Sequence, residues 1–137
     1  MYRLSPFLYG IPLLFACNSS TVPSGRVQVP IDRASFQAPA QVHFSVRNET
    51  AQTIFVSRCG ERVSLAIERH RMGAWENAGA AICPANLLMA PAELRSGEAL
   101  SDSVRVADPG EYRLVVNYGS GVLRVLYGAF SSSFVIQ

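Results

Sequence analysis

The chain contains no lysine, and charged residues make up only 16% of its 137 residues. All twelve basic residues are arginines, and ten acidic residues balance them to a formal net charge of +2. A surface with so little net charge has no strong electric field that would attract nucleic acid or an anionic lipid surface. We therefore expect no nucleic-acid partner.

The motifs of several enzyme classes are also missing. The sequence has no G-x-S-x-G elbow, no H-E-x-x-H and no phosphate-binding loop, and residues 119–121 (GSG) have the pattern of a turn. Only two histidines are present, His43 and His70, and neither is spaced as a metal co-ligand of a cysteine. We expect no catalytic residues, no metal site and no cofactor.

The sequence lacks an apolar run long enough to cross a bilayer, which takes about 20 residues. The run at residues 7–16 (FLYGIPLLFA) is shorter, follows Arg3 and ends with a small residue directly before Cys17. This pattern resembles a bacterial lipoprotein signal, in which residues 14–17 (LFAC) form the processing site. The resemblance implies that residues 1–16 are removed and that Cys17 is lipidated. An ordinary cleaved signal peptide and a buried core segment are the alternatives.

Residues 17–26 then read as a tether, because they are rich in Ser, Thr, Pro and Gly and show no apolar periodicity. One acyl chain gives only marginal membrane binding, whereas two or more hold a protein stably. We expect a lipid-anchored protein of the cell envelope, with the membrane as one partner. Asn18 is not an acidic retention residue, which favours the outer membrane, on its periplasmic or surface face.

Residues 27–137 amount to one domain, and the alternation of apolar and polar residues predicts strands. Short strands with turn residues every 8–12 positions are typical of an all-β sandwich, here antiparallel with about 7–9 strands. Only residues 78–89 or 90–94 could contain a helical turn. The predicted strands cover residues 26–31, 42–47, 53–57, 63–67, 74–76, 100–106, 111–118, 122–127 and 133–136.

Two cysteines remain after the signal, Cys59 and Cys83. An isolated pair in an exported protein is typical of a disulfide, which here would close about 25 residues and stabilise the fold by about 3 kcal/mol. A metal site is the alternative for this pair. A redox-active pair is disfavoured because the spacing is not C-x-x-C.

A tyrosine follows a tight turn at the start of a strong predicted strand. Tyr112 comes two residues after Gly110 in the sequence DPGEY. This pattern resembles the tyrosine corner of immunoglobulin-like sandwiches, which implies a hydrogen bond from the phenol to nearby backbone. The alternative is an ordinary core tyrosine after a Pro-Gly turn.

Several weak motifs occur together along residues 26–137. They are an N-E-T hairpin at 48–50, G-A-W at 73–75, the Cys59 and Cys83 pair, P-G-E-Y-R at 109–113 and S-S-F-V-I at 132–136. In this order they resemble small bacterial lipoproteins that carry one immunoglobulin-like domain. The chain is more distantly similar to the bacterial intracellular proteinase-inhibitor domain. That family is cytoplasmic, whereas the signal here indicates export.

The candidate partner contact is the hairpin that contains His70, Arg71 and Trp75. Trp and Arg are enriched at interface hot spots, although a solvated hairpin tip and a core tryptophan are the structural alternatives. We expect a non-catalytic envelope lipoprotein that acts as a protein-binding or accessory domain. The alternative function is a proteinase inhibitor that presents an exposed loop at residues 85–94.

Overall fold

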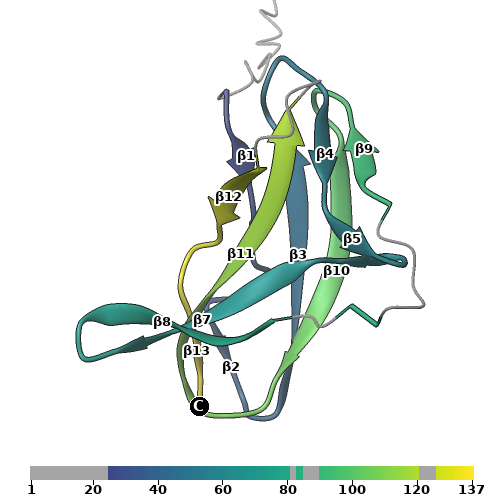
Figure 1. Ribbon diagram of the computed structural model, residues 1–137. Coiled ribbons are helices and arrows are strands. Elements are labelled where there is room, and N and C mark those ends of the chain that lie inside the picture. Colours follow the sequence, from purple (N-terminus) through teal and green to yellow (C-terminus); the bar gives the residue numbers. More distant parts are fainter. Residues whose placement is uncertain (1–24, 81–82, 85–89, 121–125) are drawn as a thin grey trace, which may run out of the picture.

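The computed structural model describes residues 25–80, 83–84, 90–120 and 126–137. Across these residues the chain forms thirteen strands and no helix, arranged as two main sheets packed face to face (Figure 1). The predicted all-β sandwich is therefore confirmed. The strands are more numerous than predicted, because short strands at residues 35–36, 58–59 and 92–94 lie outside the predicted segments and the predicted segment 63–67 is divided between two strands.

The smaller sheet is built around one long strand, β3, whose residues alternate between buried and accessible positions. Val42, Phe44 and Val46 point into the core, as the sequence alternation predicted. Antiparallel neighbours flank β3 on both sides. The strands of this sheet are β1 (Val27–Gln28), β3 (Ala40–Asn48) and β10 (Ala99–Val106).

The larger sheet is organised by its longest strand, β11. Along one side β11 pairs first with β13 and then with β12, and along the other side first with β7 and then with β4. β8 extends the sheet beyond β7, β9 extends it beyond β4, and β2 joins β13 in parallel. The strands are β2 (Ser35–Phe36), β4 (Ile54–Val56), β7 (Leu65–Arg71), β8 (Ala74–Ala80), β9 (Ala92–Leu94), β11 (Gly110–Ser120), β12 (Leu126–Phe130) and β13 (Phe134–Ile136).

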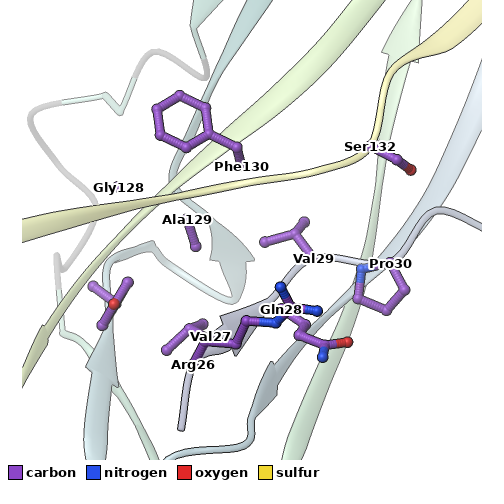
Figure 2. A pocket seen from close by; sticks show the side chains of 10 residues that line it. Arg26, Val27, Gln28, Val29, Pro30, Gly128, Ala129, Phe130 and Ser132 are labelled. Atoms are coloured by element: carbon purple, nitrogen blue, oxygen red, sulfur yellow. The ribbon is translucent and has the colours of Figure 1, made fainter. Parts of the chain in front are cut away.

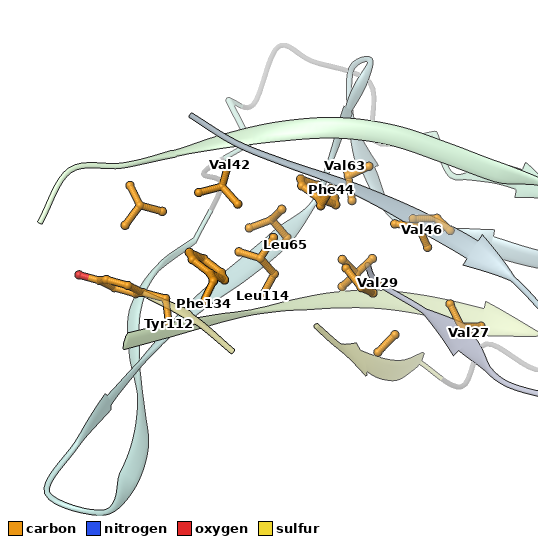
Figure 3. Close-up of a cluster of buried hydrophobic side chains, with 14 of the residues drawn as sticks. Val27, Val29, Val42, Phe44, Val46, Val63, Leu65, Tyr112, Leu114 and Phe134 are labelled. Carbon is orange, nitrogen blue, oxygen red and sulfur yellow. The ribbon is translucent and has the colours of Figure 1, made fainter. Parts of the chain in front are cut away.

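The core fills the space between the two sheets. Figure 3 shows Val42 and Phe44 of β3 on one side, with Leu114 of β11 and Phe134 of β13 on the other. These side chains are at most 4% exposed. Because full burial of a large apolar side chain contributes about 1.5–3 kcal/mol, this cluster is the main source of stability.

A separate hairpin, β5 (Arg58–Cys59) with β6 (Arg62–Val63), lies beside the smaller sheet. The disulfide between Cys59 and Cys83, with an S–S distance of 2.09 Å, ties it to the segment after β8 and confirms the predicted pairing. Asp102 of β10 also holds this hairpin. Its carboxylate accepts the Val63 N–H at 2.8 Å and pairs with the Arg62 guanidinium at 3.0 Å.

The prediction that residues 90–94 could contain a helical turn is wrong. Residues 92–94 form β9, which pairs with β4 and sets Leu94 opposite Ile54, so that both side chains are buried in the core. A strand of three residues (AEL) is too short to show a period of two. Residues 78–80 belong to β8, and the rest of the other suggested turn lies almost entirely outside the described residues.

Candidate functional site

The outward-facing side of the larger sheet carries an ordered group of aromatic and charged side chains. On β11 the even-numbered residues 112–116 are buried, so Glu111, Arg113 and Val115 point away from the core. The pairing registers place residues of β7, β8, β12 and β13 on the same side. We call this surface the aromatic face and define it by Glu68, His70, Trp75, Glu111, Arg113, Val115, Leu126, Phe130 and Val135.

Arg113 lies at the centre of the aromatic face. Its guanidinium carbon is 4.5 Å from the centre of the Trp75 ring and 4.5 Å from the centre of the Phe130 ring. Its Nε donates to the Glu68 carboxylate at 2.6 Å. Each partly exposed cation–π contact contributes about 0.5–1 kcal/mol. Three partners therefore hold the Arg113 side chain in one position.

His70 continues this row across the sheet. Its ring lies 5.0 Å from the Trp75 ring, centre to centre, and its Nδ1 is 3.1 Å from a Glu111 carboxylate oxygen. Trp75 is thus contacted by Arg113 and by His70, and both of these side chains have an acidic partner. The side chains of Arg113, Trp75 and His70 are therefore held in a row by contacts within the chain. Side chains that are already ordered lose less conformational entropy when a surface is bound.

Large apolar side chains are exposed next to this row. Leu126 is 66% exposed, Phe130 53% and Val135 40%, all on β12 and β13 at one side of the aromatic face. The outward-facing side of the smaller sheet differs in character because it is polar. Its side chains are Gln41, His43, Ser45, Arg47, Ser101, Ser103 and Arg105.

The hairpin predicted as a contact is present, and its three candidate residues are divided between two places. His70 and Trp75 lie opposite each other and belong to the aromatic face, whereas Arg71 is exposed one step nearer the tip. Sequence reasoning missed Arg113 and Phe130 as site residues, although the apolar residues at 126–130 (LYGAF) gave a weak signal for Phe130. Both become part of the site only through pairing between distant strands.

The remaining predicted residues have structural positions. The Tyr112 hydroxyl donates to the Asp108 carbonyl at 3.0 Å, and Tyr112 itself is buried, which is the hydrogen bond expected of a tyrosine corner. Arg69 lies over the Tyr112 ring at 5.6 Å and donates to the Pro109 carbonyl, so it also holds this turn. Cys17 lies outside the described residues.

A groove of about 530 Å³ runs beside the aromatic face, at the edge where β1 and β12 approach each other (Figure 2). An isolated bridge between Val29 and Ser131 joins the two segments there. Ala129 and Phe130 both line the groove, and their side chains point to opposite sides of the chain. Among the residues that line the groove, Arg26 alone carries a formal charge.

In the described part of the chain, no three His, Cys, Asp or Glu side chains lie close enough together to hold a metal ion. No helix of membrane-spanning length and apolarity occurs among the same residues. Of the loop suggested for protease inhibition, residues 85–89 lie outside the described ranges and residues 92–94 form β9.

No family model and no curated protein matches the chain. Solved structures match it with TM-scores below 0.5. They include a β-glucosidase, EmGH1, from Erythrobacter marinus (16% identity, TM-score 0.39) and the sporulation control protein Spo0M from Bacillus subtilis (9% identity, TM-score 0.43). A third is AvmM, which catalyses macrocyclization in alchivemycin A biosynthesis (12% identity, TM-score 0.36).

The matched regions cover 80%, 82% and 82% of this chain, respectively. They cover 15% of EmGH1, 49% of Spo0M and 89% of AvmM. The chain therefore spans a small part of the glucosidase and about half of Spo0M. At these TM-scores the similarities carry no argument about function.

Proposed function

We propose that this chain is a lipid-anchored, non-catalytic binding module of the bacterial cell envelope, which holds a partner protein on its aromatic face. In this proposal residues 1–16 are a signal peptide, Cys17 carries the lipid, residues 17–26 are the tether and residues 27–137 form an immunoglobulin-like binding domain. The anchoring membrane is the outer membrane.

The contrast between the two outward-facing sides of the sandwich carries the proposal. One side is polar, as expected of a solvated sheet, while the other exposes Phe130 and Val135 beside a fixed row of Trp75, Arg113 and His70. Contiguous exposed apolar surface on a small protein marks interaction sites. Tryptophan and arginine dominate binding energy at protein interfaces. A protein partner fits this combination of residues.

The test is photo-crosslinking in cells, with the full-length anchored protein carrying a photoreactive amino acid at position 130 or, as a matched control, at exposed position 105 on the polar side. We expect position 130 to form an adduct with one envelope protein, identified by mass spectrometry, and position 105 to form none. Equal adducts from both positions, or none from position 130, would contradict the proposal.

Binding of the purified partner provides the quantitative check. Phe130→Ala removes an exposed side chain without disturbing the core, and we expect it to weaken binding at least tenfold, as a hot-spot truncation does. Arg105→Ala is the matched control and should leave the affinity unchanged. If the captured protein is a protease that loses activity in a one-to-one complex, the proteinase-inhibitor hypothesis replaces the binding module.

A further inference from the structure

The tip of the β7–β8 hairpin presents a methionine to solvent. Two residues, Met72 and Gly73, connect the paired residues Arg71 and Ala74. The hairpin extends well beyond the body of the sandwich (Figure 1). Met72 has a relative exposure of 105%, the highest of the exposed large apolar side chains in the described ranges. An apolar side chain therefore occupies the most prominent position on this part of the surface.

The backbone at this position does not favour methionine. Met72 has a φ of 50° and is the only non-glycine residue with positive φ in the described part of the chain; Gly73 follows with a φ of 79°. Two-residue hairpin turns with both φ values positive prefer Asn-Gly, because asparagine tolerates the left-handed region better than other side chains. Folding stability therefore gives no reason for a methionine here, whereas a binding role does.

The structure also holds the base of this tip in place. The next residue pair of the hairpin, one step farther from the tip than Arg71 and Ala74, is His70 with Trp75. These two rings contact each other, and Glu111 and Arg113 hold them against β11. An isolated two-stranded ribbon is only marginally stable in water. The contacts with β11 therefore give the tip a defined direction, which lowers the entropy lost on binding.

We propose that Met72 inserts into an apolar pocket of a partner protein, with Arg71 beside a carboxylate on the rim of that pocket. This inference rests on the proposed function and extends it from the aromatic face to the hairpin tip. Methionine adapts its shape to irregular apolar sites. Arg71 is exposed and forms no ion pair within the described part of the chain, so its charge is available to an acidic partner.

The position of the hairpin favours a protein over the anchoring membrane. The chain enters the sandwich at Gly25, whose N–H donates to the Glu49 carbonyl just beyond the end of β3. The hairpin leaves near the start of β11, at Glu111, and projects sideways from the half of the sandwich that lies farther from the start of β1 (Figure 1). A lipid at Cys17 would place the Gly25 end nearest the membrane, so the hairpin that carries Met72 would leave from the half of the sandwich farther from the membrane.

The test replaces Met72 in the full-length protein. A photoreactive amino acid at position 72 should form an adduct in cells with the same envelope protein that position 130 captures. The purified captured protein is then the binding probe. We expect M72N to weaken binding at least tenfold while its thermal unfolding midpoint stays equal to or above that of the wild type. M72L should recover most of the binding that M72N loses, and Arg105→Asn is the matched surface control.

The charge of Arg71 has its own readout. We expect R71Q to weaken binding severalfold at low salt, and this difference from the wild type to shrink as salt rises, because exposed charges are screened.

Equal binding by M72N and wild type would overturn the inference. So would an adduct at position 72 with lipid or with a second copy of this chain. Capture at position 130 without capture at position 72 would refute the proposed insertion of Met72 alone. Capture at neither position would refute both that insertion and the binding role of the aromatic face.

Discussion

Asn48 links three segments at one end of the sandwich. It is fully buried at the end of β3, and its amide nitrogen donates to the Gln52 and Leu94 carbonyls at 2.7 and 2.9 Å. Its side-chain oxygen accepts from the Thr50 N–H and hydroxyl. The side chain therefore ties the turn after β3 to β9. The N-E-T sequence that marked a hairpin is thus a structural anchor.

Replacing Asn48 with alanine should be among the most destabilising single changes in this chain. The variant loses four hydrogen bonds and leaves the Leu94 carbonyl buried without this donor, so we expect the free energy of unfolding to fall by about 3 kcal/mol. Urea denaturation measures it. Asn117→Ala is the matched control, since Asn117 is exposed on β11, and should change stability by less than about 0.5 kcal/mol. A loss below about 1 kcal/mol for Asn48→Ala would contradict this account.

The sequence separation between a residue and its hydrogen-bond partner explains which site residues could be predicted. Tyr112 could be found because its hydrogen-bond partner, Asp108, lies four residues away and the turn between them has a sequence signature. Arg69 and Arg113 could not, because their hydrogen-bond partners, Pro109 and Glu68, lie 40 and 45 residues away in the sequence. No local pattern records the register that brings Glu68 opposite Arg113.

At the scale of elements, strand length decided which parts of the fold could be predicted. β3, with nine residues, shows enough alternation to reveal both its existence and its buried face. β2, β5 and β6 have two residues each, too few to show any period. These short strands exist because longer neighbours or covalent links hold them, as β13 holds β2 and the disulfide holds β5.

The disulfide should contribute a large share of the stability of the β5–β6 hairpin. Because the cysteines are 24 residues apart, we expect the double variant Cys59→Ser/Cys83→Ser to lose about 3 kcal/mol of unfolding free energy, by restoring chain entropy to the unfolded state. Urea denaturation with and without a reductant measures this. Reductant should destabilise the wild type and leave the double variant unchanged. Equal stability of oxidised wild type and double variant would contradict the prediction.

At the scale of the whole molecule, the proposed functions occupy separate places. The chain enters at one end of the sandwich, through Gly25. The β7–β8 hairpin projects near the other end (Figure 1). The aromatic face lies on the outward-facing side of the larger sheet. β11 runs for eleven residues between these ends, about 37 Å of extended chain. A tether at the first end therefore leaves the face and the tip accessible to a partner.

This arrangement requires that the lipid be attached at Cys17, and labelling tests the requirement directly. In cells supplied with an alkyne-bearing fatty acid, we expect the wild-type chain to become labelled and its N-terminal peptide to begin at an acylated Cys17. Cys17→Ser should abolish the label, since a serine hydroxyl does not replace the thiol. Cys83→Ser should keep it, which shows that Cys83 does not carry the label. An unlabelled wild type would remove the membrane anchor, whose strength comes from about 0.8 kcal/mol per buried CH₂ of each acyl chain. The orientation argument for Met72 would fall with it, while the binding test of the aromatic face would stand unchanged.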